Sequence, residues 1–353
     1  MQTQDNLVLE TAERVFRDLA DPQSIILRGD DGWKAPLWQA LEDTGLPAAW
    51  APEALGGADL SMADGFAVVR AAGRAALAVP LVDTMVANWV LGRAGIPVPA
   101  GRIALVLPRG RARVAIDPAG RVDAHARKVP FACEADHLLV LAPGARGASV
   151  ALVPASRCAF TPGRSLAGDA LDDVEISASS DAHRAGVEGV GVDRVAMLAG
   201  TVRASQIAGA LEAMLEISVN YSQERVAFGK TISKFQAVQH NLARLGGEVA
   251  AAVAVAQSAA DAIASDDIGA DELLLEVGAA KVRCGEAAEA GAAISHQVMG
   301  AIGFTVEHVL HRFTLRALSW RDEFGDEVEW SRRLATLVAA RSSGEFWRLL
   351  AAR

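Results

Sequence analysis

The stretch Arg225–Leu245 reads RVAFGKTISKFQAVQHNLARL. An arginine precedes a Phe-Gly turn, and a new helix is predicted to begin at Lys230–Ser233. An arginine, a glycine-relaxed turn and a polar helix face can together bind a phosphate-bearing cofactor, but the same pattern is also typical of a tight turn between two helices. Apolar residues recur in this helix at intervals of three and four, which predicts one continuous stripe. The stripe comprises Phe235, Val238, Leu242, Leu245 and Val249, and the opposite face carries Gln236, Gln239, His240, Asn241 and Arg244.

Composition narrows the class of protein. A chain of 353 residues can form two or three packed units. Hydrophobic residues make up 51% of it and aromatic residues only 5%, so its cores must be built from Ala, Val and Leu, which favours closely packed helices. A formal net charge of −9 argues against a nucleic-acid-binding protein, which needs a concentrated basic face. It does not argue against an anionic ligand in a local basic pocket.

The cysteines and the N-terminal sequence suggest a compartment. Cys133, Cys158 and Cys284 are odd in number and widely spaced, so they predict neither a disulfide framework nor a zinc site. The first residues lack a basic start followed by an apolar core, and no apolar run reaches the length of a membrane span. We therefore expect a soluble cytoplasmic protein that binds neither membrane nor nucleic acid.

Changes of hydrophobic period divide the chain into three predicted domains. Residues 1–100 carry helical patterns, residues 101–180 carry short strand-like runs between Gly, Pro and Asp turns, and residues 185–353 are helical again. The fold class is therefore mostly α with a small antiparallel β domain. The expected helices are 5–20, 37–44, 61–77, 80–95, 192–222, 235–264, 271–299, 306–322 and 328–351, and the expected strands are 103–107, 113–116, 138–141, 150–153 and 174–176. The long stripe of the 235–264 helix, and a turn at 265–269, are typical of a four-helix bundle.

Two spaced motifs resemble the signatures of the acyl-CoA dehydrogenase family. The segment 297–304, a Gln followed by a Gly-rich turn, resembles the second C-terminal signature, and Glu53–Gly57 resembles an acidic-Leu-Gly-Gly loop near the start. The first signature is matched by Tyr221, Arg225, Phe228-Gly229, Ile232, Phe235-Gln236, Val238-Gln239 and Leu242-Ala243. The resemblance implies an N-terminal helical domain, a β-barrel-like middle domain and a C-terminal four-helix bundle.

The same resemblance implies a binding site for FAD, whose adenine-side arm crosses a subunit boundary in the family. Arg225 would pair with the pyrophosphate, and Phe228, Ile232 and Gln236 would line the adjoining surface. Gln297, Gly300 and Ala301 would receive the AMP part, where glycine allows close approach of the backbone. The alternative is that these residues have a purely structural role and only stabilise the turns of the bundle.

The base that the family's chemistry requires has no match in this sequence. That base is a carboxylate that removes the proton α to the thioester, while the β hydride passes to the flavin. Many members place it directly before a glycine, where this chain has Phe324-Gly325, and others place it where this chain has Ala199. Glu323 lies beside the first position and is a weak candidate, because an acid between Asp322 and Asp326 is more often a solvated charge. The middle domain also departs from the family: the Thr-Glu-Pro loop and the Trp-x-Thr strand that meet the flavin ring are missing, and Lys128–Cys133 stands in place of the strand.

Three hypotheses remain open at this point. The chain can be the base-deficient subunit of a heteromeric FAD-linked acyl-CoA dehydrogenase, with a homologous subunit, an acyl-CoA substrate and an electron-transfer acceptor as partners. It can instead be a self-sufficient homo-oligomeric dehydrogenase that uses Glu323 or another acid. It can also be a structural or regulatory partner that binds no flavin. His308 and His311 beside Glu307 have a spacing that metal ligands use, but no third ligand is indicated, so no metal site is expected.

Overall fold

A computed structural model describes residues 2–265 and 267–351, so the predicted turn at 265–269 lies partly outside the described residues. By its internal contacts the chain forms two compact units, which are described separately here. The first comprises residues 1–20, 30–68 and 77–199, and the second comprises residues 21–29, 69–76 and 200–353. The division into three domains stays a prediction.

The first unit combines short helices with a β-sandwich. The helix α5 is buried over nearly its whole length, which is typical of a core helix that is apolar all round. Its Asn88 donates a hydrogen bond from Nδ2 to the carbonyl of Pro47 at 2.8 Å, so a polar group in this core has a partner. The helices of this unit are α1 (Gln2–Leu19), α3 (Lys34–Asp43), the first part of α4 (Met62–Arg74), α5 (Leu81–Arg93) and the 3-10 turns η1 (Leu46–Ala48) and η2 (Glu53–Leu55).

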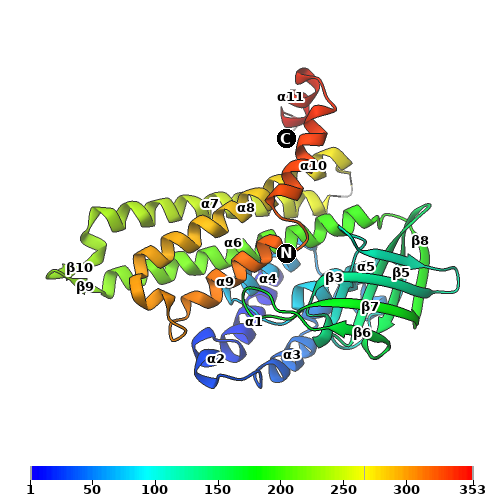
Figure 1. Ribbon diagram of the computed structural model, residues 1–353, viewed down its shortest axis with the longest axis horizontal. Coiled ribbons are helices and arrows are strands. Elements are labelled where there is room, and N and C mark those ends of the chain that lie inside the picture. The colour runs from blue at the N-terminus through cyan, green and yellow to red at the C-terminus, as the bar shows by residue number, and fades with distance from the viewer. Residues whose placement is uncertain (1, 266, 352–353) are drawn as a thin grey trace. The chain divides into compact units, whose positions relative to one another are not determined.

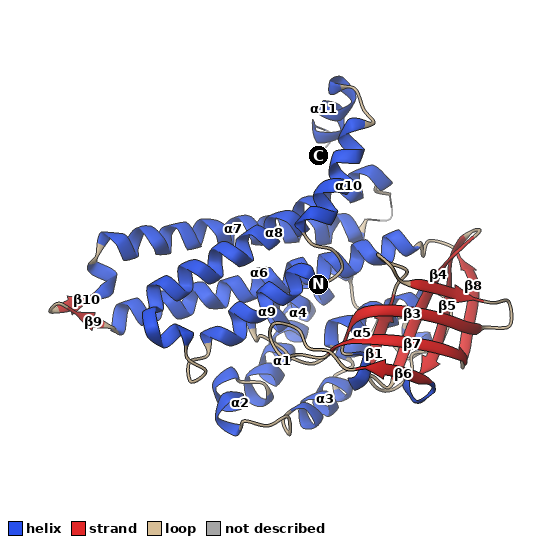
Figure 2. Cartoon of the chain, viewed as in Figure 1, coloured by secondary structure: helices blue, strands red, loops and turns tan. Residues whose placement is uncertain are grey.

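Two four-stranded sheets form the β part (Figure 2). One has the order β1-β4-β5-β8 and the other β2-β3-β7-β6. Alanine, valine and leucine side chains from both sheets, such as Val106, Val122, Leu138, Val140 and Val174, are buried together. The strands are β1 (Ile103–Val106), β2 (Arg113–Ile116), β3 (Arg121–Pro130), β4 (His137–Gly144), β5 (Gly147–Pro154), β6 (Cys158–Thr161), β7 (Leu171–Ser179) and β8 (Ala182–Val187), with the turns η3 (Ala132–Glu134) and η4 (Ala155–Arg157).

Long helices build the second unit. Within it α7 and α8 pack along each other, and a two-stranded hairpin joins the end of α6 to the start of α7 (Figure 1). Among the described residues α7 is the one helix long and apolar enough to cross a membrane, and here it is a helix of the bundle. The elements are α2 (Pro22–Arg28), the end of α4, α6 (Val192–Glu224), β9 (Val226–Ala227), β10 (Lys230–Thr231), η5 (Ile232–Lys234), α7 (Gln236–Ala264), α8 (Ala270–Met299), η6 (Gly300–Phe304), α9 (Leu310–Asp322), α10 (Glu327–Ala339) and α11 (Ser343–Ala351).

Two predicted helices of the second unit differ from the observed ones. The helix expected over 328–351 is two helices, because Ser342 and Glu345 cap a new start: the backbone N–H of Ser342 donates to Oε2 of Glu345 at 2.9 Å. The helix expected from 306 begins at Leu310, whose N–H donates to Nδ1 of His308 at 3.1 Å.

The β part differs in one pairing. All strands were expected to be antiparallel, yet β1 runs parallel to β4, with Ile103 opposite His137. Antiparallel neighbours need only a short turn, whereas the β1–β4 pair requires the chain to cross over through β2 and β3 in the other sheet. A pattern of short strands shows their existence but not which of them become neighbours.

Candidate functional site

The predicted cofactor residues fall into two groups, both in the second unit. The first group lies on the hairpin β9–β10 and the start of α7, and the second at the end of α8 and in η6. Since α7 runs away from the hairpin and α8 returns antiparallel to it, both groups lie at the same end of the bundle (Figure 1). Among the described residues no hydrogen bond or ion pair joins one group to the other.

The hairpin presents Arg225 to solvent. The backbone N–H of Ile232 donates to the carbonyl of Arg225 at 2.8 Å, and Lys230 pairs with Ala227 across the hairpin. Side chains of directly opposed residues share one face, so Arg225 and Lys230 lie on the same face, diagonal neighbours about 7–8 Å apart in such ladders. In the part of the chain that the structure describes, the Arg225 guanidinium has no ion-pair partner. It is free to bind an anion.

The turn of the hairpin is strained and exposed. Its two central residues both have positive φ, 51° at Phe228 and 79° at Gly229, as a tight two-residue hairpin requires. Glycine adopts this backbone without cost, but a phenylalanine does so rarely, and the Phe228 side chain is 95% exposed. Its ring meets Phe235 edge-on at 6.2 Å, and Nζ of Lys230 lies 4.5 Å from the centre of the Phe235 ring. An exposed, strained aromatic residue beside two cations is a typical feature of a binding surface.

The stripe of α7 changes along the helix. From Leu245 onward it is buried, through Val249, Ala256 and Ile263. Over the first two turns it is only half-buried, at Val238 and Leu242. Gln236 at the helix start is exposed, and Nε2 of Gln239 donates to the carbonyl of Ser233 at 3.0 Å. The helix therefore leaves part of its apolar face open at the end that carries the hairpin.

The second group surrounds a histidine that sequence analysis did not single out. Gln297 directly follows His296 near the end of α8, and Gly300 begins η6 with φ of 66° and open space around it. The His296 ring stacks on Phe304 at 4.4 Å, and its Nε2 lies 3.2 Å from Oγ1 of Thr314. Burial lowers the pKa of His296, and the neighbouring His311 lowers it further, although a backbone hydrogen bond with Gly303 opposes both. A neutral imidazole therefore braces the segment that contains Gly300 and Ala301.

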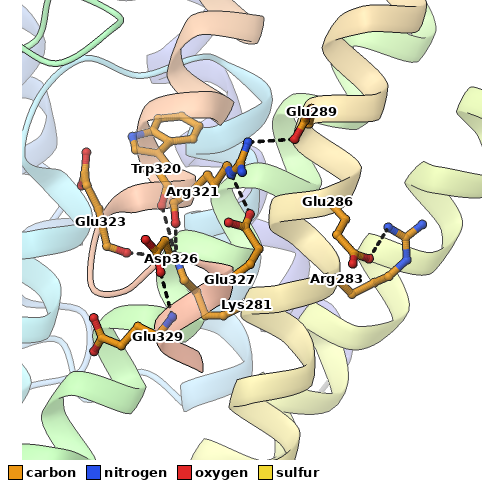
Figure 3. A network of polar contacts seen from close by, with 10 residues as sticks. All are labelled: Lys281, Arg283, Glu286, Glu289, Trp320, Arg321, Glu323, Asp326, Glu327 and Glu329. Atoms are coloured by element: carbon orange, nitrogen blue, oxygen red, sulfur yellow. Dashed lines mark hydrogen bonds and ion pairs between the residues drawn. The ribbon is translucent and has the colours of Figure 1, made fainter. Parts of the chain in front are cut away.

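The segment between α9 and α10, where the resemblance predicts the position of the base, is anchored at several points. Buried Lys281 donates from Nζ to the carbonyls of Trp320, Arg321 and Glu323 at 3.2, 3.0 and 2.9 Å, and so closes the end of α9 (Figure 3). Nε1 of Trp330 donates to the carbonyl of Phe324 at 3.2 Å. Phe324 itself has φ of 54°. The backbone around position 324 is thus fixed from both sides.

Glu323 is not the solvated charge that its acidic neighbours suggested. Its side chain is 10% exposed, and Oε2 lies 2.6 Å from Nε of Arg203, which is 1% exposed. These two residues are 120 positions apart in the chain, and no sequence pattern links them. Arg203 on α6, like His296, is therefore a residue that sequence reasoning missed.

Ion pairs also surround this segment. Arg321 lies 2.7 Å from Glu327 and 3.0 Å from Glu289, and the hydrogen bond with Glu327 raises the pKa of Arg321 (Figure 3). Asp326 accepts the backbone N–H of Glu329 at 2.8 Å and caps α10. These contacts hold α8, α9 and α10 together, and each acid that they use has a structural role.

The other candidates for chemistry have local structural roles. His308 and His311 bind groups of their own turn, Nδ1 of His311 lying 2.7 Å from the carbonyl of His308, and the described residues contain no cluster of three potential metal ligands. Burial raises the pKa of Cys133 and Cys158 to about 11 and that of Cys284 to about 12, so none of the three is a reactive thiolate near neutral pH.

Comparison with known proteins identifies the family. The family model described as "Acyl-CoA dehydrogenase, C-terminal domain" matches residues 193–327. The chain is 32% identical to the acyl-CoA dehydrogenase FadE34 of Mycobacterium tuberculosis over 324 residues, which cover 88% of this chain and 43% of FadE34. It is 27% identical to the acyl-CoA dehydrogenase IpdE2 of the same organism over 335 residues, 94% of this chain and 96% of IpdE2. Residues 193–327 thus match the acyl-CoA dehydrogenase family, and over most of its length the chain is similar to named acyl-CoA dehydrogenases.

A solved structure agrees on the fold. The chain superposes on one from the crystal structure of the ChsE4-ChsE5 complex of Mycobacterium tuberculosis with a TM-score of 0.84, at 24% identity, over 96% of this chain and 98% of the other. The predicted family and the predicted fold class are therefore confirmed. The chain spans less than half the length of FadE34 but nearly all of IpdE2.

Proposed function

We propose that this chain is a subunit of a heteromeric FAD-linked acyl-CoA dehydrogenase, which it supplies with the nucleotide arm of the FAD site but not with the catalytic base. The observation that carries the proposal is the contrast between an exposed arginine and a missing carboxylate. Arg225 is exposed without an acidic partner, whereas the position of the family's base is occupied by Phe324 in a fixed segment.

The residues present fit one part of FAD. Arg225 supplies a planar donor for a diphosphate, Lys230 a second positive charge, and Gly300 an open backbone that an AMP moiety can approach. Phe228, Ile232 and Gln236 supply the surface beside them. The cofactor, when bound, provides the acceptor for the hydride from the β carbon of the thioester.

The carboxylate that removes the α proton must come from another subunit. Removal of the α proton requires a carboxylate within hydrogen-bond reach of the substrate, and this chain has Phe324 and Ala199 at the two family positions. Glu323 is buried and paired with Arg203, so its carboxylate is already bound within the chain. A homologous subunit that carries the glutamate completes the reaction, and electrons then pass to an external acceptor.

The open face of α7 supports a subunit role. Val238 and Leu242 are half-buried, and Phe228 is exposed at the same end of the bundle. Apolar surface of this kind beside a cationic hairpin is expected to be covered in an assembly. We expect the assembled enzyme to act in the cytoplasm.

The test compares the isolated chain with the assembled complex. The isolated chain with added FAD should not reduce an artificial electron acceptor in the presence of an acyl-CoA. Co-production with a homologue that carries the glutamate should give a yellow complex with one FAD per pair of unlike subunits. Turnover by the isolated chain, abolished by Glu323→Gln, would instead establish a self-sufficient dehydrogenase. A complex without flavin would establish a structural partner.

A further inference from the structure

Arg203 lies beside both positions from which the family draws its base. Ala199 precedes it by four residues on α6, which is one helical turn. The ring of Phe324 lies 5.3 Å from the guanidinium carbon of Arg203. The neighbouring Gly200 faces the same cluster, since a Cβ there would lie 3.2 Å from the Trp330 ring and 3.5 Å from Lys281.

The guanidinium is held firmly in this place. Its Nε lies 2.6 Å from Oε2 of Glu323, and Nη1 donates to Oε1 of Gln206 at 2.8 Å. Its side chain is 1% exposed, so water screens its charge weakly. A carboxylate placed on the Phe324 backbone would therefore meet a buried positive charge at short range.

The backbone of the segment cannot easily turn such a carboxylate away. Lys281 binds the carbonyl of Glu323, and Trp330 binds the carbonyl of Phe324. Rotation of position 324 would break these buried hydrogen bonds. Hence the substitution at position 324 is not the whole reason why this end of the chain lacks a base.

We propose that Arg203 is a positioning residue that keeps this end of the chain inactive: it pairs with Glu323, packs on Phe324, and would capture any carboxylate introduced at position 324. The inference rests on the proposed function, because the base positions are those of the family. A carboxylate captured in this way stays ionised and does not accept a proton from a substrate carbon. The loss of the base is therefore built into α6 as well as into the segment between α9 and α10.

Titration of a carboxyl installed at position 324 tests the proposal. The matched pair is Phe324→Glu with Glu323→Gln, and the same protein with Arg203→Gln in addition. The two proteins differ only at position 203, and because both carry Glu323→Gln, neither contains a buried Glu323 carboxylate without a partner. With 13C-labelled glutamate, the new carboxyl resonance is identified by its absence from the Phe324→Gln protein. Circular dichroism establishes that each variant is folded.

With Arg203 present, the pKa of the new carboxyl should lie about one unit or more below the ordinary value of about 4.3. With Arg203→Gln it should be clearly higher, because burial then acts with only Lys281 as a nearby cation, and Nζ of Lys281 is already bound to backbone carbonyls. Equal pKa values in the two proteins would overturn the inference.

A second comparison guards against misfolding of the Arg203→Gln protein. Arg203→Lys keeps a charge without the planar fork, and should give a pKa between those expected with arginine and without any cation. A value in Arg203→Lys no higher than with arginine would also count against the proposal. Turnover by the unmodified isolated chain would remove the proposed function, whereas the titration concerns Arg203 alone, so the two failures are distinguishable.

Discussion

Arg203 lies within α6 and Arg225 follows directly after the end of that helix, yet the two arginines have opposite surroundings. Arg203 is 1% exposed and has a carboxylate, an amide and an aromatic ring around its guanidinium. Arg225 is exposed, and only its backbone is fixed, by bonds with Tyr221 and Ile232. A buried arginine whose donors are used within the chain stabilises the fold. An exposed arginine on a rigid hairpin is available to a ligand.

The two phenylalanines with positive φ repeat this contrast. Phe324 at 54° is held by Trp330 and stacked under Arg203, so its conformation is stabilised inside the chain. Phe228 at 51° is 95% exposed, and among the described residues an edge contact with Phe235 is the one ring contact that it makes. Strain that the fold does not compensate indicates a surface that a cofactor or partner covers.

The largest effect should follow from breaking the buried pair. Arg203→Met leaves the Glu323 carboxylate buried without its cation, which should lower the free energy of unfolding by about 3–5 kcal/mol. Adding Glu323→Leu should recover much of that loss, since no charge is then left unpaired. The measurement is urea-induced unfolding followed by circular dichroism.

Arg74→Met is the matched control for this experiment. Arg74 pairs with Glu216 at a half-exposed position, so its loss should cost at most about 1 kcal/mol. Equal destabilisation by Arg203→Met and Arg74→Met would show that burial does not distinguish the two pairs.

The next effect concerns cofactor affinity rather than stability. Arg225→Ala in the assembled complex should remove a charge-assisted contact of about 1.5–3 kcal/mol, which is about a tenfold or greater loss in FAD affinity. Arg225→Lys should recover only part of it. The free energy of unfolding of the isolated chain should stay within about 0.5 kcal/mol of the wild-type value, because Arg225 is exposed. Equal FAD content in Arg225→Ala and wild type would remove Arg225 from the site.

The same contrast explains what sequence could and could not predict. The hairpin lies within a continuous stretch, where a Phe-Gly turn between two helical patterns predicts its own geometry. The interpretation of position 324 rests on its distance from a motif and stays a prediction. Arg203 and Glu323 are 120 positions apart, and their pairing depends on how α6 packs against the end of α9. Local periodicity carries no information about such pairings.

The β part shows the same limit. The strands β2 and β7 follow from β-branched runs between turns, but the parallel pairing of β1 with β4 does not. The short helix α2 was missed because seven residues give no helical period. Its cap was readable, however: Asp21 accepts the N–H of Ser24 at 2.8 Å, and a proline follows it.

A smaller effect on FAD affinity should distinguish the two lysines near the exposed hairpin. Lys230 shares a face with Arg225, whereas Lys234 lies in the 3-10 turn that follows the hairpin. Lys230→Ala should weaken FAD binding by the complex about two- to fivefold, as expected for an exposed ion pair. Lys234→Ala should leave the FAD affinity of the complex unchanged. The difference in FAD affinity between the two variants should become smaller at high salt. Equal losses from both would mean that only the net charge of the region matters.

The smallest effect is a pH dependence at the end that carries His296. Burial lowers its pKa in the folded chain below the ordinary 6.5, so between the two values the unfolded chain binds more protons than the folded one. The contribution of neutral His296 to stability is therefore present above pH 6.5 and is lost as the pH falls through its folded pKa. His308, whose pKa burial also lowers, should add to the same trend.

Unfolding free energies at pH 7.5 and 5.5 should accordingly differ less in His296→Gln than in the wild type. His240→Gln, on the exposed face of α7, should leave the difference unchanged. FAD retention by the complex should weaken over the same interval, because His296 braces the segment Gly300–Phe304 by stacking on Phe304. An identical slope in wild type and His296→Gln would show that the pH response arises elsewhere in the chain.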